Sequence, residues 1–246
     1  MSTDAIIFDL GNTLIYFDGE WESLHPLRDK ALMDRLHAAG IYPPEVSFLA
    51  QFNAMLTSYY TERETEFIEQ TTSYLLCLAL EEWGYTEVPD PIIRDTLAGM
   101  YAITQAHWKI EEDAHPTLRT LKERGYRLGL ISNAGDDADV QTLIDQSSLR
   151  GYFDTILTSA AMGIRKPNPR IFQAILDNWG LPAPRVVMVG DNLGADILGA
   201  RNAGIYSVWI TRRADTPANR SHEDTIQPDA MVSSLSELLP LLESLK

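Results

Sequence analysis

Five short apolar runs without polar alternation constrain the fold of this 246-residue chain more than any other feature. The runs lie at residues 4–10, 126–131, 152–157, 185–189 and 205–210. A strand that is apolar on both faces is typical of a parallel sheet that helices cover on both sides. Helical patterns separate the later runs, so the chain from about residue 114 onward predicts a doubly wound, Rossmann-like α/β core.

Two helices of this core carry clear boundary signals. Apolar residues at helical spacing predict a helix over residues 169–179, with Asn168 as its N-cap. A capping box formed by Ser234 and Glu237 predicts a closing amphipathic helix over residues 234–245. Both helices would pack against the predicted sheet.

Residues 17 to 112 break the alternation of strands and helices. This segment has few β-branched runs, and prolines punctuate it. We therefore predict an all-helical cap domain over residues 17–112, inserted into a core formed by residues 1–16 and 113–246. The expected cap helices cover approximately residues 24–39, 45–60, 64–83 and 91–109.

Composition excludes several classes of partner. The formal net charge of −15 argues against binding to nucleic acid or to an anionic membrane, because both require clustered Lys and Arg. The longest apolar stretch, residues 74–80, is far shorter than the ~20 residues that span a bilayer. The single cysteine, Cys77, suits a reducing compartment. We expect a soluble, cytoplasmic protein, and the sequence does not indicate its oligomeric state.

Reactive polar residues follow three of the apolar runs. Asp9 follows the first run, Ser132 the second and Asp191 the fourth. Ligands of open α/β sheets bind beyond the carboxyl ends of the strands, so these side chains are expected to converge. Lys166 stands just before the predicted helix at residues 169–179, where it would add positive potential.

This set of residues suits phosphoryl transfer. A carboxylate such as Asp9 can attack phosphorus and form an aspartyl-phosphate. Asp9, Asp191 and Asp196 would repel a phosphate dianion, each like pair costing on the order of 4 kcal/mol at ~4 Å. A Mg²⁺ ion would remove that repulsion, because it prefers oxygen ligands. Ser132 would donate a hydrogen bond to the phosphoryl group.

The same segments resemble the motifs of the haloacid dehalogenase superfamily, in the branch with a helical cap inserted after the first strand. The resemblance covers the whole chain. The matching segments are Asp9-Leu10-Gly11-Asn12-Thr13 for the first motif, Ser132 for the second, Lys166 for the third, and Gly190-Asp191 with Asp196 for the fourth.

The resemblance implies a Mg²⁺-dependent phosphatase that acts on a small phosphorylated metabolite. It implies three groups of site residues. The catalytic residues are Asp9, Ser132 and Lys166; the substrate-binding residues are Gly11, Asn12, Ser132, Asn133 and Lys166; and the metal ligands are Asp9, the carbonyl of Gly11, Asp191 and Asp196.

Gly11 departs from the family pattern. Phosphatases of the family usually have an aspartate at this position, which acts as general acid and then as general base. Such help is typically worth 10²–10⁴-fold in rate. We expect either a preference for substrates with good leaving groups or a substitute acid near the cap hinge, with Asp18, Glu20 and His25 as candidates.

Two alternatives remain open at the level of sequence. One is a non-hydrolytic binding or regulatory protein, which would bind a ligand without turnover or stay phosphorylated on Asp9. The other is a 2-haloacid dehalogenase. Family members with that chemistry lack the first acid of the fourth motif and have an aromatic residue in place of Gly11, whereas Asp191 is present here.

The substrate itself is not indicated by the sequence. In the architecture that the resemblance implies, the cap selects the part of the substrate beyond the phosphate. Tyr16 and Phe17, beside the hinge, are candidates to face the crevice. The aromatic residues of the cap could also line it, although core packing explains them equally well: Tyr59, Tyr60, Trp83 and Trp108.

Overall fold

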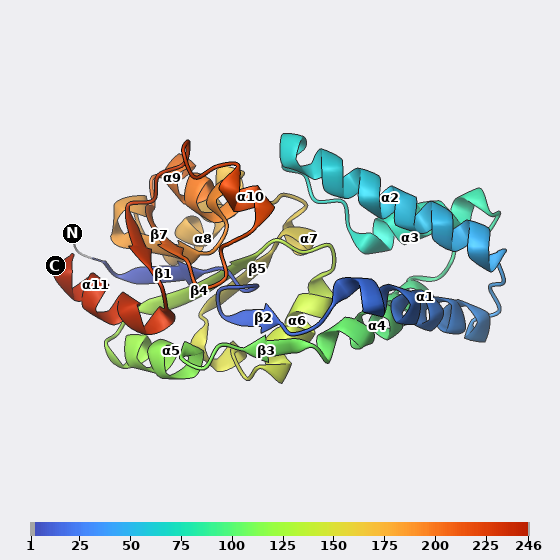
Figure 1. Cartoon of the computed structure of the whole chain (residues 1–246), viewed down its shortest axis with the longest axis horizontal. Coiled ribbons are helices and arrows are strands. Elements are labelled where there is room, and N and C mark those ends of the chain that lie inside the picture. The colour runs from blue at the N-terminus through green and yellow to red at the C-terminus, as the bar shows by residue number, and fades with distance from the viewer. Residues whose placement is uncertain (1–2, 246) are drawn as a thin grey trace.

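The computed structural model describes residues 3–245, and for residues 64–66 the backbone only. Its main sheet has six strands in the order β5-β4-β1-β6-β7-β8, and every neighbouring pair is parallel. Helices lie on both sides of this sheet (Figure 1), which confirms the doubly wound α/β core. The strands are β1 (Ala5–Phe8), β4 (Arg127–Ser132), β5 (Thr155–Thr158), β6 (Val186–Gly190), β7 (Tyr206–Ile210) and β8 (Ala230–Val232).

The uninterrupted apolar character of the strands follows from burial on both faces. In β1, Ile6 and Phe8 belong to one buried cluster, while Ala5 and Ile7 belong to another on the opposite face. The first cluster includes side chains from α5 (Ala114–Glu123), α6 (Asp137–Gln146) and α11 (Leu238–Ser244). The second includes side chains from α8 (Pro169–Trp179) and α9 (Leu198–Asn202).

Short elements complete this core lobe. Two are single helical turns, α7 (Ser159–Met162) and α10 (Pro217–Arg220). Three are 3-10 turns, η1 (Arg150–Tyr152), η2 (Ala183–Arg185) and η4 (Leu235–Glu237). One is a π-helical turn, η3 (Leu193–Ile197), which leads directly into α9.

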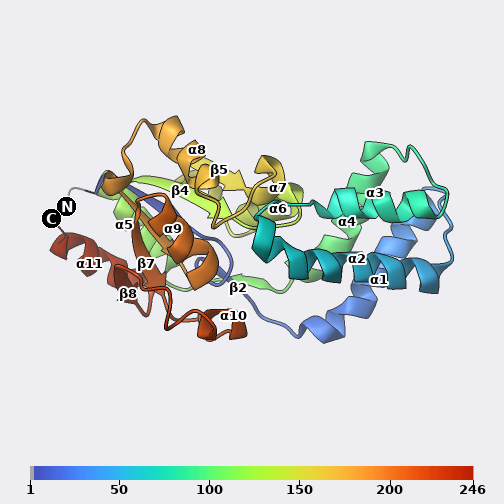
Figure 2. The same cartoon turned by 90° about the horizontal axis from the view of Figure 1, so that it is seen from above.

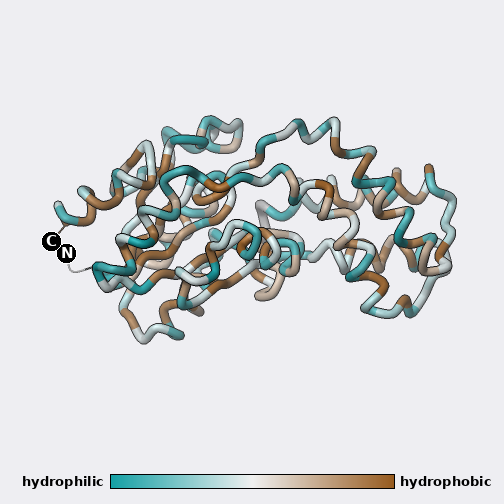
Figure 3. Tube along the Cα trace, turned by 90° about the horizontal axis from the view of Figure 1, so that it is seen from below, coloured by the Kyte–Doolittle hydropathy of each residue, from teal (hydrophilic) through white to brown (hydrophobic). Residues whose placement is uncertain are grey.

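Four helices form a second lobe, which we call the cap lobe. They are α1 (Trp21–Ala38), α2 (Glu45–Glu66), α3 (Thr72–Glu82) and α4 (Asp90–Gln105). The cap lobe has its own buried cluster, to which all four helices contribute. Figure 2 shows the two lobes side by side, and Figure 3 shows hydrophobic stretches inside both. The division of the chain into domains at residues 16/17 and 112/113 stays a prediction.

A two-stranded antiparallel ribbon joins the lobes. It pairs β2 (Ile15–Phe17) with β3 (Trp108–Ile110), so the chain leaves and re-enters the core side by side. The sequence does not indicate this ribbon: the expected fourth cap helix runs to residue 109, whereas α4 ends at Gln105. Each strand has only three residues, which is too short for a periodicity signal.

Two arginines of the core hold the base of the ribbon. The guanidinium of Arg212 lies 2.9 Å from the Glu111 carboxylate and 2.7 Å from that of Asp113. Arg213 also pairs with Glu111, and its guanidinium lies 3.6 Å from the centre of the Tyr16 ring. Glu111 is buried, and such a charge needs partners of opposite sign. The ribbon is therefore anchored to the loop after β7.

The predicted cap helix over residues 64–83 is confirmed from Thr72 to Glu82 as α3, but its predicted start is wrong. The chain leaves α2 at Phe67, whose φ of 53° is left-handed, and α3 begins only at Thr72. Between them the backbone pairs with the core: Glu69 N donates to Gly163 O at 3.2 Å, and Arg165 N donates to Phe67 O at 3.1 Å. Tertiary hydrogen bonds therefore override a helical pattern that continues through this segment in the sequence.

The helix-boundary signals had mixed outcomes. The helix at residues 169–179 is confirmed, with the Asn168 side chain accepting from Arg170 N. The predicted capping box of the last helix is wrong, because the Glu237 carboxylate accepts from the backbone N–H and hydroxyl of Ser233 instead of Ser234. The closing helical segment starts with the 3-10 turn η4, and α11 follows directly from Leu238.

Across residues 3–245, no helix combines the length and the apolar character that crossing a membrane would require.

Close packing of α8 against the sheet predicts a specific mutational effect. A Cβ at Gly129, which pairs with Ile7, would lie 2.6 Å from the Trp179 ring and would also meet Ile175. We expect Gly129→Ala to lower the free energy of unfolding by about 1–3 kcal/mol, the usual cost of overpacking a core. Urea denaturation followed by circular dichroism measures this.

Gly151→Ala is the matched control, because a Cβ there meets no atom within 4 Å. Equal unfolding midpoints for the two variants would contradict the packing described for β4 and α8.

Candidate active site

The candidate site lies where the sheet changes its winding direction. β1 lies between β4 and β6, and the chain winds outward from it on both sides. Such a switch point opens a crevice beyond the carboxyl ends of the strands. All eight predicted site residues line one cavity of about 290 Å³ at this place: Asp9, Gly11, Asn12, Ser132, Asn133, Lys166, Asp191 and Asp196.

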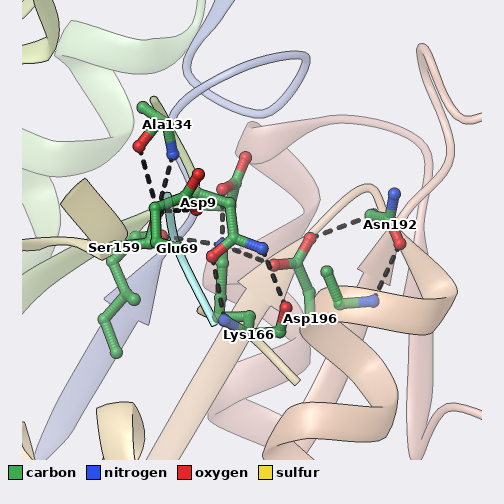
Figure 4. Close-up of polar contacts among 10 residues, drawn as sticks. Asp9, Glu69, Ala134, Ser159, Lys166, Asn192 and Asp196 are labelled. Carbon is green, nitrogen blue, oxygen red and sulfur yellow. Dashed lines mark hydrogen bonds and ion pairs between the residues drawn. The ribbon is translucent and has the colours of Figure 1, made fainter. Parts of the chain in front are cut away.

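Lys166 is the centre of this arrangement. Its Nζ lies 2.6 Å from Asp9 Oδ1, 2.6 Å from Asp196 Oδ1 and 2.7 Å from the carbonyl oxygen of Ile131. The Lys166 side chain is only 1% exposed, and Figure 4 shows it between Asp9 and Asp196. Burial alone would lower the pKa of this ammonium group, but the attraction of the two carboxylates outweighs burial and raises the pKa. Lys166 therefore stays charged.

Three buried carboxylates form a cluster. Those of Asp9, Asp191 and Asp196 each offer an oxygen within 4.8 Å of the others. Burial raises the pKa of Asp9 to about 6, with Lys166 opposing and Asp196 adding to the shift. Burial and the charges of Asp9 and Asp196 raise the pKa of Asp191 well above its usual range. More negative charge is concentrated here than Lys166 alone compensates.

The carboxylate cluster fits a divalent cation. Its ligand atoms are carboxylate oxygens, which Mg²⁺ prefers, and they converge from the ends of two adjacent strands. The negative charges of Asp9 and Asp196 help to raise the pKa of Asp191, and a bound cation would relieve this repulsion. The residues that would hold the ion are Asp9, Asp191 and Asp196. Gly11 lines the same cavity, and the role of its carbonyl as a ligand stays a prediction.

The loop after β6 holds Asp191 and Asp196 in place. The carbonyl of Asp191 accepts hydrogen bonds from Trp209 Nε1 and Asn219 Nδ2, both at 2.8 Å. Asp196 Oδ2 accepts from Asn192 N at 3.0 Å, which folds the π turn η3 back over the strand end. A Cβ at Gly190 would collide with the Asp196 carboxyl group, so glycine is required there.

Ser132 and Asn133 follow β4 and differ in what their side chains do. Ser132 is buried and lines the cavity. The side-chain amide of Asn133 donates to Lys166 O and accepts from Lys166 N, each at 2.9 Å. Asn133 therefore positions Lys166, and a direct contact of Asn133 with substrate stays a prediction.

Gly11 lies under an aromatic ring. A Cβ built on Gly11 would lie 3.6 Å from Cη2 of Trp108, which comes from β3 of the ribbon. The indole is thus within ordinary van der Waals distance of that Cβ position. Asn12 has a φ of 57°, in the left-handed region that asparagine tolerates. The turn after Asp9 forms without an acidic residue at position 11.

The predicted hinge and cap candidates lie mostly outside the cavity. Asp18, Glu20 and His25 are exposed, and none of them lines it. The Tyr16 ring lies under Arg213, and Phe17 stacks on Trp21 with ring centres 4.0 Å apart. Of the aromatic residues named from the sequence, Trp108 lines the cavity and the others do not: Tyr16, Phe17, Tyr59, Tyr60 and Trp83.

A buried ionic network, which no local sequence pattern indicates, docks the cap lobe beside the site. Glu69 Oε2 lies 3.4 Å from the guanidinium of Arg165 and accepts from Ser159 Oγ at 2.6 Å. Ser159 Oγ accepts in turn from Ala134 N at 2.8 Å, and Figure 4 shows Ser159 between Glu69 and Ala134. The hydroxyl of Tyr59 also donates to Glu69. A cap residue is thus linked to the loop after Ser132.

Two more charged residues of the cavity lining were not singled out from the sequence. Asp139, in the first turn of α6, and Arg63, on α2, both border the cavity. Asp139 belongs to the acidic run Asp136-Asp137-Ala138-Asp139, which indicates a helix start but no site. Asp139 reaches the cavity from α6 of the core, whereas Arg63 reaches it from α2 of the cap lobe.

Comparison with known families is consistent with this geometry. The family model described as haloacid dehalogenase-like hydrolase matches residues 3–204, which include every predicted motif. The chain is 38% identical over 127 residues to the glyceraldehyde 3-phosphate phosphatase of Methanothermobacter thermautotrophicus. That match covers 51% of this chain and 55% of the relative. The chain thus spans about half the length of this curated relative.

Two solved structures share the whole fold. The 2-haloacid dehalogenase of Pseudomonas syringae pv. Tomato DC3000 superposes with a TM-score of 0.66 at 25% identity, covering 99% of this chain and 100% of the other. A haloacid dehalogenase-like (HAD) phosphatase from Thermococcus onnurineus superposes with a TM-score of 0.64 at 22% identity, covering 98% of each chain. The latter likeness supports the fold alone.

The docking network predicts a loss of stability on neutralising Glu69. In Glu69→Gln the neighbouring Arg165 keeps its buried charge and loses an anionic partner. We expect the free energy of unfolding to fall by about 2 kcal/mol, the scale of a buried hydrogen bond to a charged group. Thermal and urea denaturation measure this fall. Glu81→Gln, on the exposed face of α3, is the control and should change stability by less than about 0.5 kcal/mol. Similar values for both variants would refute the docking role.

Proposed function

The chain belongs to the haloacid dehalogenase-like hydrolases, and we propose that it is a Mg²⁺-dependent phosphatase that acts on a small phosphorylated metabolite. One observation carries this proposal. A carboxylate at the end of the central strand, a buried lysine and two further carboxylates line a single cavity. The volume of about 290 Å³ suits a small molecule. The phosphatase name of the relative from Methanothermobacter also supports this reaction class.

In the proposed reaction Asp9 is the nucleophile. One of its carboxylate oxygens attacks the phosphorus atom and forms an aspartyl-phosphate, while the bond between phosphorus and the leaving oxygen breaks. Lys166, which contacts Asp9 Oδ1, balances the charge of the transferring phosphoryl group and orients the nucleophile. Water then attacks the phosphorus atom and releases inorganic phosphate, which restores the Asp9 carboxylate.

The remaining residues bind and orient the phosphoryl group. Ser132 borders the cavity beside Asp9 and offers a hydroxyl donor. Asp191 and Asp196 would hold the Mg²⁺ ion together with Asp9. When bound, Mg²⁺ offsets the negative charge of the carboxylates and of the phosphate. The anchored loop after β6 keeps Asp191 and Asp196 in place during the reaction.

Dehalogenation is a second candidate, because a 2-haloacid dehalogenase from Pseudomonas syringae shares the whole fold at 25% identity. In that reaction Asp9 would attack carbon, and no metal would be needed. Asp191 has no role there, yet it lies in the carboxylate cluster with Asp9 and Asp196. Release of chloride from 2-chloropropionate would identify this activity. We favour the phosphatase because it uses all three carboxylates.

The phosphatase proposal predicts metal-dependent release of phosphate. The substrates would be acetyl phosphate, p-nitrophenyl phosphate, glucose 1-phosphate and glycerol phosphate, each with and without Mg²⁺. We expect Asp9→Asn to reduce the rate by on the order of 10³-fold or more, because it removes the nucleophile.

Two outcomes would contradict the proposal. The first is no release from any substrate by a folded protein that binds Mg²⁺, which would favour the binding or regulatory alternative. The second is a stable phosphoprotein after acid denaturation without turnover, which would favour a protein that remains phosphorylated on Asp9.

The metal site makes a separate prediction that does not depend on turnover. We expect Asp191→Asn to weaken Mg²⁺ binding by at least the roughly 10- to 100-fold that loss of an outer-shell partner costs. Calorimetric titration with MgCl₂ measures this. Asp215→Asn, at an exposed position paired with Arg220, should leave Mg²⁺ binding unchanged. Equal Mg²⁺ affinities for both variants would exclude Asp191 as a ligand.

A further inference from the structure

The proposed reaction needs a proton donor that the site near Asp9 does not contain. When a phosphate ester of an ordinary alcohol is cleaved, the leaving oxygen would depart as an alkoxide unless an acid protonates it. Asp9, Lys166 and the metal-binding carboxylates already have roles in the proposed function, on which this inference rests. The cavity lining also includes Arg63 and Arg165, and guanidinium groups do not release a proton in proteins. The remaining titratable side chain of the lining is Asp139.

We propose that Asp139 is the general acid of the first step and the general base of the second. Its placement is defined by the start of α6, which follows the Ser132 loop directly. Asp136 caps the helix by accepting a hydrogen bond from Asp139 N at 2.9 Å. This cap holds the first turn of α6, and Asp139 lines the same cavity as Asp9.

A cap-lobe residue orients the Asp139 carboxyl group. Gln105, the last residue of α4, donates from Nε2 to Asp139 Oδ1 at 2.8 Å. Within residues 3–245 the other oxygen, Oδ2, has no hydrogen-bond donor. The Gln105 amide thus fixes the carboxyl group through one oxygen and leaves the second available for a proton. This contact forms only because α4 of the cap lobe packs against α6 of the core.

The surroundings of Asp139 favour a carboxyl group that exchanges its proton near neutral pH. Burial raises its pKa to about 6; the Gln105 hydrogen bond and the charge of Arg28 oppose this rise, and the charge of Asp136 adds to it. Arg94 and Tyr101 of α4 face Asp139 across a small neighbouring cavity, and Arg63 of α2 shares the main one. An acid in this range is suited to donate and accept protons in turn.

The proton balance of the two steps is complete. In the first, the bond from Asp9 oxygen to phosphorus forms, the bond from phosphorus to the leaving oxygen breaks, and that oxygen takes the Asp139 proton to leave as an alcohol. In the second, water attacks the phosphorus atom and gives a proton to the Asp139 carboxylate, while the bond from phosphorus to the Asp9 oxygen breaks. Inorganic phosphate leaves, and both aspartates return to their starting forms.

The decisive experiment compares Asp139→Asn with the unmodified protein on two Mg²⁺-supported substrates. Glycerol phosphate has a poor leaving group, whereas p-nitrophenyl phosphate leaves without protonation. We expect the variant to lose about 100-fold in kcat/KM on glycerol phosphate, the low end of general-acid help. On p-nitrophenyl phosphate, the first step should change by less than about 10-fold.

The pH profile supplies an independent readout. Donation requires protonated Asp139, a form that is populated below its pKa of about 6 and lost as the pH rises through that value. On glycerol phosphate, kcat/KM of the unmodified protein should therefore fall above about pH 6. Asp139→Asn should lack this fall.

Two control variants separate catalysis from docking of the cap lobe. Gln105→Leu removes the hydrogen bond that lowers the Asp139 pKa, so it should shift the fall in kcat/KM to higher pH while keeping the preference between the two substrates. Asp137→Asn removes a neighbouring charge outside the cavity lining and should preserve both the profile and the preference.

Equal losses on both substrates in Asp139→Asn, with an unchanged pH profile, would overturn the acid–base role and leave the phosphatase proposal standing. If Gln105→Leu and Asp139→Asn changed the substrate preference and the pH profile in the same way, Gln105 and Asp139 would serve to dock the cap lobe. That outcome would also overturn the acid–base role of Asp139. If the unmodified protein released no phosphate from any substrate with Mg²⁺ present, both proposals would fall together.

Discussion

The position of Lys166 between Asp9 and Asp196 is the interaction on which the site depends. One buried ammonium group joins the end of the central strand, the loop after β6 and the carbonyl of Ile131 at the end of β4. A buried charge is tolerated only with partners of opposite sign and satisfied hydrogen bonds. The three strand ends must therefore meet in one arrangement for Lys166 to be buried at all, and Asn133 fixes the backbone that carries it.

The cap lobe is connected to this centre by two routes. The β2-β3 ribbon places the Trp108 ring over Gly11, and Arg212 and Arg213 hold the base of the ribbon. On the other side, Glu69 reaches into the core and contacts Arg165 and Ser159. Buried ion pairs add little net stability compared with apolar packing, but removing one partner leaves an uncompensated buried charge and is strongly destabilising. The position of the cap lobe is thus linked to the loop after Ser132, where phosphate is proposed to bind.

Gly11 illustrates how a local departure from a motif is resolved in three dimensions. At position 11 the chain offers a backbone carbonyl and no acid, and the indole of Trp108 lies within van der Waals distance of the place where a Cβ would stand. The acidic function that is absent from the first motif has a candidate in Asp139, which reaches the cavity from α6 and is oriented by Gln105. Hinge residues such as Asp18 lie nearer in sequence but face solvent.

Local signals in the sequence predicted the parallel sheet, the helical character of residues 17–112 and the convergence of Asp9, Ser132 and Asp191, because apolar strand runs and polar residues at strand ends are patterns of neighbouring residues. The resemblance to the haloacid dehalogenase superfamily added the rest of the site set. The ribbon, the break after α2 at Phe67, the contacts of Glu69 and the place of Asp139 in the cavity lining came only from the tertiary structure. They depend on contacts between residues distant in the chain, such as Glu69 with Arg165 and Gln105 with Asp139, and no periodicity or spacing records such pairs.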